Sequence, residues 1–207
     1  MADGEVAGLA RLTVKHSVPF LRGPAGRLLA AIPLVFCGLT PPAEAQTATA
    51  PALKAAFLYN FAKFTAWPGA ALGPSDPLVL CVLNDRAVTD MLVSLTQNRS
   101  IDGHALVVRA MKLDSPALSE CRLLFVSGLD GAESAALIDA VAGKPIFTVS
   151  DHDRFAQFGG VAGFYVEGGT LKFAINHDAA QRAGLQLSSK LLGLARIVKD
   201  DRSAIRR

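Results

Sequence analysis

The 207-residue sequence is poor in the residues from which catalytic and metal sites are built. It has three cysteines and four histidines, and no two histidines have the spacing that a zinc-binding helix requires. Gly159, Gly160 and Gly163 lead into a predicted strand and do not open a helix, so they do not form a phosphate-binding loop. Ser127 lacks the glycine expected two positions before a hydrolase nucleophile, because Phe125 stands there. We therefore expect no enzymatic activity, no cofactor and no metal.

The sequence also lacks a large excess of positive charge. The formal net charge is +3, and charged residues make up 19% of the chain. A nucleic-acid-binding domain of this size usually has a clustered basic surface that gives a much larger excess. We expect no nucleic-acid partner.

The N-terminal region has no apolar run long enough to span a membrane. Arg27 precedes twelve largely apolar residues, 28–39, which Pro33 interrupts, whereas a spanning helix needs about 20. The triplet Ala43-Glu44-Ala45 follows, and small residues at such positions are typical of a cleavage site. We predict a secretory signal peptide over 1–45 and export to the periplasm, with a membrane anchor as the alternative.

The rest of the sequence divides into a linker at 46–51, one domain at 52–199 and a charged tail at 200–207. The domain keeps two cysteines, Cys81 and Cys121. An even pair in an exported protein indicates one disulfide, and two buried free thiols are the alternative.

Short runs rich in valine, leucine and isoleucine alternate along the domain with helical patterns. We predict strands at 77–83, 104–111, 121–127 and 145–150, helices at 52–67, 85–97 and 133–143, two strands around a Gly-Gly turn within 161–176, and a helix from Ser188 to Val198. This alternation predicts a three-layer α/β domain with a mostly parallel sheet, flanking helices and a C-terminal β-hairpin plus helix. In the common strand order 2-1-3-4, the two cysteines lie on neighbouring strands.

The first predicted helix carries five aromatic residues in eleven positions. We expect one face of this helix to pack into the core, with Phe61 at its edge. The residues of this face are Leu53, Phe57, Phe64 and Trp67. We expect Asn60, inside the apolar stripe, to bond a strand-end or loop backbone group. Tyr59 and Lys63 flank the stripe and are assigned to a surface for a protein partner or a homodimer contact.

Polar residues follow two of the predicted strands. Asn84 and Asp85 come after the first, and Ser127 ends the third. The carboxyl ends of strands in a doubly wound sheet border a crevice, so these three residues are candidates for binding a small ligand. We interpret Asp151-His152-Asp153, after the fourth strand, as the start of a helix.

Several stretches of the sequence resemble the YfiR family of periplasmic proteins, in the same order over about residues 52–198. They include "KAAFLYNFAKFTAWP", "LVLCVLND", "CRLLFVSG", "PIFTVSD" and "FGGVAGFYVEGGTLKFAIN". The resemblance implies repression of an inner-membrane diguanylate cyclase through its periplasmic portion, and thereby control of cyclic di-GMP and biofilm formation. It also implies an OmpA-like outer-membrane lipoprotein that relieves the repression.

The resemblance also implies that Cys81 and Cys121 form a disulfide, because they match the disulfide positions of the family. A second cysteine pair, found in some members, is missing from this sequence. A periplasmic small-molecule sensor is the alternative function. The two functions are compatible, because a ligand can bias the binding of a partner.

Overall fold

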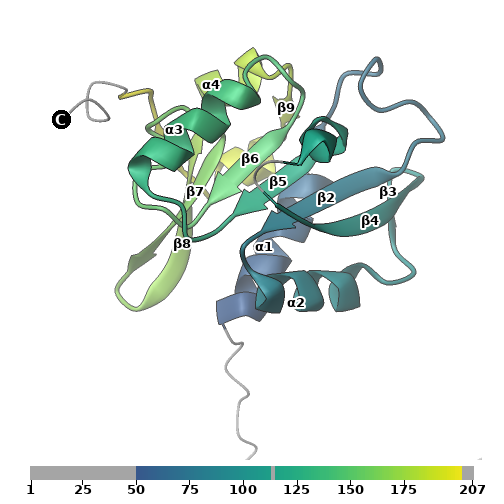
Figure 1. Ribbon diagram of the computed structural model, residues 1–207, viewed down its shortest axis with the longest axis horizontal. Coiled ribbons are helices and arrows are strands. Elements are labelled where there is room, and N and C mark those ends of the chain that lie inside the picture. The colour runs from purple at the N-terminus through teal and green to yellow at the C-terminus, as the bar shows by residue number, and fades with distance from the viewer. Residues whose placement is uncertain (1–49, 113–114, 202–207) are drawn as a thin grey trace, which may run out of the picture. The chain divides into compact units, whose positions relative to one another are not determined.

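The computed structural model describes residues 50–112 and 115–201 (Figure 1). The predicted signal peptide, most of the linker and the last six residues of the charged tail lie outside the described residues. The first helix, α1 (Ala50–Lys63), begins two residues inside the predicted linker. Of the helices in these ranges, none is both long enough and apolar enough to cross a bilayer.

An eight-stranded sheet in the order β10-β8-β7-β6-β5-β2-β4-β3 forms the centre of the domain. Its strands are β2 (Leu78–Leu83), β3 (Ser100–Ile101), β4 (His104–Met111), β5 (Leu123–Val126), β6 (Phe147–Ser150), β7 (Ala162–Glu167), β8 (Thr170–Asn176) and β10 (Arg196–Val198). The five strands from β4 to β7 are parallel, and β7 and β8 form an antiparallel hairpin. The predicted order 2-1-3-4 is confirmed in β4-β2-β5-β6.

Helices cover both faces of the sheet. In β2 all six residues are buried, and successive side chains enter opposite cores. Leu80 and Val82 pack with α1 and α2 (Arg86–Thr96), whereas Cys81 and Leu83 pack with α3 (Gly131–Ala140) and the 3-10 helix η1 (Pro116–Glu120). Figure 1 shows α1 and α2 close together and α3 apart from them. The three-layer α/β prediction is confirmed.

The rings of α1 form the centre of one core, although not in the predicted arrangement. Phe61, which we expected at the edge, has no exposed surface. Its ring centroid lies 5.3 Å from that of Phe147 and 4.9 Å from that of Phe173. Asn60 is exposed, and its amide donates to the carbonyl of Ala56 at 2.9 Å within the same helix. The buried stripe is therefore rotated from the predicted one, because it continues through Ala55, Leu58 and Ala62.

The predicted helix over 52–67 is too long by four residues. The chain leaves α1 after Lys63, and Thr65–Ala66 form a short strand, β1, that pairs with β9 (Gln186–Leu187). The Thr65 hydroxyl donates to the carbonyl of Phe61 at 2.7 Å and so satisfies one of the last carbonyls of the helix. The partner strand lies about 120 residues away in the sequence, which is why the local pattern does not reveal it.

The end of the domain also differs from the prediction. The helix that Ser188 caps, α5, covers only Ser189–Leu192, and Val198 lies on β10, parallel to β8. A short helix that the sequence did not reveal, α4 (His177–Arg182), follows β8 and is capped by Asn176. The expected helix at Asp151-His152-Asp153 is wrong, since Asp151 and His152 form a bend and Asp153 begins a turn.

Charged side chains join β10 to the hairpin. The carboxylate of Glu167 accepts hydrogen bonds from Lys172 and Arg196, and the guanidinium of Arg196 lies 4.1 Å from the ring centroid of Tyr165. The hydrogen bond from Lys172 lowers the pKa of Glu167 and raises that of Lys172. The three charged side chains face solvent, so they contribute to the position of the strand more than to stability.

We predict that Phe61→Ala lowers the free energy of unfolding by about 3–5 kcal/mol, the usual cost of deleting a buried ring. Urea unfolding followed by circular dichroism measures the effect. Lys63→Ala, an exposed position on the same helix, is the control and should change the value by less than about 0.5 kcal/mol. A loss below about 1 kcal/mol for Phe61→Ala would contradict the central position of this ring.

Candidate functional site

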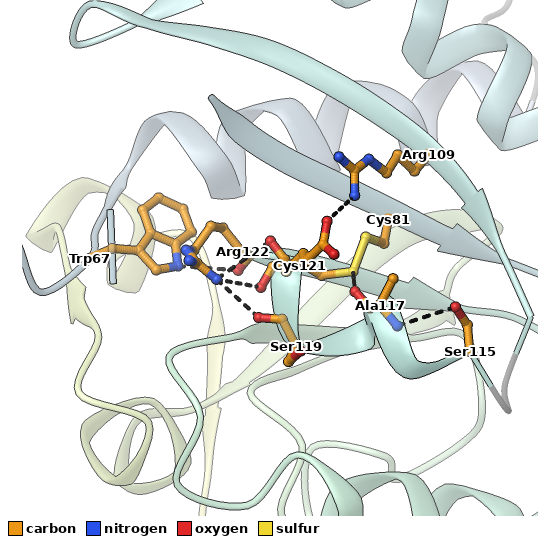
Figure 2. Close-up of a disulfide and its surroundings, with 9 residues drawn as sticks. Trp67, Cys81, Arg109, Ser115, Ala117, Ser119, Cys121 and Arg122 are labelled. Atoms are coloured by element: carbon orange, nitrogen blue, oxygen red, sulfur yellow. Dashed lines mark hydrogen bonds and ion pairs between the residues drawn. A yellow bond between two sulfur atoms is a disulfide. The ribbon is translucent and has the colours of Figure 1, made fainter. Parts of the chain in front are cut away.

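Cys81 and Cys121 form a disulfide, which confirms the predicted pair (Figure 2). Their Cα atoms lie 5.8 Å apart, and both residues are fully buried. Cys121 does not open β5 as predicted; it follows η1, and β5 begins two residues later. The bridge therefore joins the middle of β2 to the end of the 3-10 helix.

Next to the disulfide, the side chain of Arg122 connects the loop after β1 to the sheet through hydrogen bonds. Its Nε donates to the carbonyl of Ala71 at 2.7 Å, and its Nη1 donates to the carbonyls of Ser119 and Cys121. The indole of Trp67 donates to the carbonyl of Arg122 at 3.1 Å. Figure 2 shows the Trp67 ring beside the Arg122 guanidinium, close to the bridge. This end of the sheet is held by one covalent bond and a group of directed hydrogen bonds.

Charged side chains meet at the opposite, carboxyl end of the strands. Lys54 of α1 lies 2.7 Å from the carboxylate of Asp151 and 3.7 Å from that of Asp85. The hydroxyl of Ser127 donates to Asp151 at 2.7 Å, and the Lys54 ammonium lies 5.5 Å from the ring centroid of Phe125. We call Lys54, Asp85, Ser127 and Asp151 the carboxyl-edge cluster. It connects the first helix to the ends of three parallel strands.

The structure brings together two of the three predicted ligand residues. Asp85 and Ser127 both belong to the carboxyl-edge cluster, and the backbone N–H of Ser127 donates to the carbonyl of Leu83 at 3.2 Å. Asn84 is exposed, with a positive φ of 59°. Asp85 also caps α2, because its Oδ1 accepts from the N–H of Val88. Ligand binding by these residues stays a prediction.

Sequence reasoning missed Lys54 and Asp151 as members of this cluster. A signal was present for Asp151, since it follows β6 as Asp85 follows β2, and the carboxyl ends of parallel strands meet at one edge. No comparable signal marks Lys54, which reaches the cluster from a helix. Its side chain is 17% exposed, and those of Asp85 and Asp151 are 16% and 24% exposed.

Tyr59 and Lys63, the predicted partner surface, lie on α1. Tyr59 is half-buried and packs against the core, and the guanidinium of Arg99 lies 5.6 Å from its ring centroid. Lys63 is exposed, with its ammonium 5.8 Å from the Phe64 ring centroid. A role in partner binding stays a prediction for both residues.

A protein-family model described as YfiR/HmsC-like matches residues 51–196. The chain belongs to this family. The match runs from α1 to the first residue of β10 and so includes both cores, the disulfide and the carboxyl-edge cluster. It supports a role as a periplasmic regulator. Within residues 50–112 and 115–201, no three His, Cys, Asp or Glu side chains are grouped so that they could hold a metal ion.

We predict that the double substitution Cys81→Ala, Cys121→Ala lowers the free energy of unfolding by about 4 kcal/mol. The reason is that the bridge joins residues 40 positions apart and so restricts the conformations of the unfolded chain. Urea unfolding measures the loss. Thiol labelling of the unreduced, denatured wild-type protein is the matching control. If both cysteines react there without reductant, the bridge does not exist in the protein.

We also predict an energetic coupling between Lys54 and Asp151. Removing Lys54 leaves two poorly exposed carboxylates without their cation, so a double-mutant cycle of Lys54→Met and Asp151→Asn should give a coupling free energy of about 1–3 kcal/mol. Lys63→Met, on the exposed side of the same helix, is the control and should show none with Asp151→Asn. Additive effects of the two cluster substitutions would exclude the coupling.

Proposed function

We propose that this protein is a periplasmic regulator that binds and represses an inner-membrane diguanylate cyclase through the periplasmic portion of that enzyme. Repression lowers cyclic di-GMP and limits biofilm formation. The supporting observation is the family match, which extends over nearly the whole α/β domain. The resemblance of the sequence to YfiR proteins supplies the identity of the partner.

Regulation by binding also fits the chemistry of the carboxyl-edge cluster. Its ammonium, carboxylate and hydroxyl groups bond one another, and one carboxylate also caps a helix. A general base needs a lone pair directed at a substrate proton, whereas Asp85 uses both carboxylate oxygens, and Asp151 its Oδ2, in contacts within the protein. We propose that the protein has no catalytic activity of its own.

The proposal includes export and two further contacts. Residues 1–45 are the signal peptide, and the disulfide suits the oxidising periplasm. An OmpA-like outer-membrane lipoprotein relieves the repression by binding the regulator, and the regulator itself forms homodimers. The lipoprotein contact extends the family resemblance, whereas export rests on the N-terminal sequence pattern and the homodimer contact on the aromatic residues at the edge of the first helix.

A second candidate function is the sensing of a small molecule at the carboxyl edge of the sheet. Asp85 and Ser127 lie in one cluster there, with exposed Asn84 beside them. A ligand that displaces Lys54 from Asp151 would loosen α1 from the sheet and so change the surface offered to a partner.

We predict that deleting the gene raises cyclic di-GMP and increases surface attachment, because the cyclase is released from repression. Mass spectrometry of nucleotide extracts measures the change. Two control strains sharpen the test: one restored with the wild-type gene, and one that also lacks the cyclase, in which the deletion should have no effect. Unchanged cyclic di-GMP in the deletion strain, with the cyclase shown to be expressed, would exclude the repressor function.

A further inference from the structure

An open cavity lies at the amino edge of the parallel strands, opposite the carboxyl-edge cluster. Its walls come from the loop after β1, from the residues that precede β5 and β6, and from the end of α4 with the residues after it. The volume is about 550 Å³. A smaller cavity of about 150 Å³ shares Gly143, Lys144, Arg182 and Ala183 with it, so the two are adjacent. We call the larger one the amino-edge cavity.

Positive side chains line the amino-edge cavity without acidic neighbours. Its cations are Arg122, Lys144 and Arg182, and among the described residues that line either cavity there is no aspartate or glutamate. Arg182 is compensated by Asp200, whose carboxylate lies 2.9 Å from its Nη2. Over residues 50–112 and 115–201, neither Arg122 nor Lys144 forms an ion pair. The cavity therefore has two cations that no carboxylate of these residues pairs with.

Backbone carbonyls hold the guanidinium of Arg122 in the wall of this cavity. Its Nε donates to the carbonyl of Ala71 at 2.7 Å and its Nη1 to that of Ser119 at 3.3 Å, and both of these residues line the cavity. Its Nη2 forms no hydrogen bond with any residue that the structure describes, so two N–H donors are left for a ligand. Because the guanidinium is already fixed, little side-chain freedom is lost when an oxyanion binds.

We propose that the amino-edge cavity binds a phosphate dianion, either free phosphate or the monoester of a small molecule. Arginine and lysine are the side chains that bind phosphate most often. A phosphate monoester carries a charge of about −1.5 to −2 at neutral pH, which matches the two unpaired cations, Arg122 and Lys144. A carboxylate or the phosphodiester of a phospholipid carries one charge and would leave one of these cations without a partner.

The smaller cavity receives the rest of a monoester. Its lining includes the apolar residues Ile138, Val141 and Ile146, and it shares Lys144 and Arg182 with the amino-edge cavity. A small apolar group attached to the phosphate would therefore be covered there, while the phosphate stays beside the cations. A phosphate site at this edge is independent of the proposed cyclase repression, because it does not depend on which protein the regulator binds.

The experiment titrates the processed, disulfide-bonded protein with inorganic phosphate and with ethyl phosphate, a monoester that has a small apolar group. Diethyl phosphate, a diester with one charge, is the control at the same ionic strength. Isothermal titration calorimetry gives the Kd of each probe, and amide chemical shifts in NMR spectra locate the binding. We expect both dianions to bind at least about tenfold more tightly than the diester and to shift the amide signals of Lys144 and Gly184, which line the cavity.

Substitutions of the two unpaired cations test the cavity itself. Arg122→Met should weaken binding of both dianions at least about tenfold, the effect of losing a charge-assisted hydrogen bond. Lys144→Met should weaken it at least about fivefold; Lys144 is exposed, so this variant tests the site even if Arg122→Met disturbs the fold. The matched controls are Arg86→Met and Lys190→Met, since both residues are exposed and line neither cavity. They should leave the Kd unchanged.

The two probes also distinguish the sources of the phosphate. Tighter binding of ethyl phosphate supports a small monoester as the ligand, and tighter binding of inorganic phosphate supports free phosphate.

Three results would overturn the phosphate site. They are an equal affinity for diethyl phosphate, a Kd that Lys144→Met leaves unchanged, and chemical shift changes confined to residues outside the two cavities. Vesicles of phosphatidylglycerol provide a last comparison. If the protein sediments with these vesicles but binds neither dianion, the cavity does not select a phosphate dianion and the proposal is wrong.

Discussion

The burial of β2 on both faces is the constraint on which the rest of the structure depends. All six of its residues are buried, so the domain needs apolar cover above and below a single strand. The aromatic and aliphatic side chains of α1 and α2 supply one cover, and η1, α3 and the disulfide supply the other. The residues that bury each face of β2 are distant from it in the sequence. Local structure alone therefore cannot bury either face.

Elements whose signal is local could be predicted from the sequence. The apolar runs at 77–83 and 104–111 and the Gly-Gly hairpin give strands close to the predicted bounds. The disulfide was also predictable. The domain is predicted to be exported, and its two cysteines fall on strands that are neighbours in the common order 2-1-3-4. The carboxyl-edge cluster was predicted in part, because residues that follow parallel strands meet at the same edge.

The errors fall where distant segments decide the conformation. Residues 65–66 and 196–198 continue helical patterns in the sequence, yet each pairs with a strand elsewhere in the chain. Sequence periodicity placed Phe61 at the edge of the apolar face, whereas the sheet contributes Phe147 and Phe173 on the side where Phe61 points. Lys54 was overlooked for the same reason, because its two carboxylate partners come from the ends of β2 and β6.

The position of the disulfide has a mechanical consequence. The bridge makes residues 81–121 a closed covalent loop, and this loop contains α2, β3 and β4. A tension applied between the chain before Cys81 and the chain after Cys121 passes through the sulfur–sulfur bond and bypasses the loop. Forty residues of extended chain, about 130–140 Å at the usual reach per residue, therefore cannot be drawn out of the domain. Under such a load the backbone of α2, β3 and β4 carries no tension, whereas that of β5 and the strands after it does.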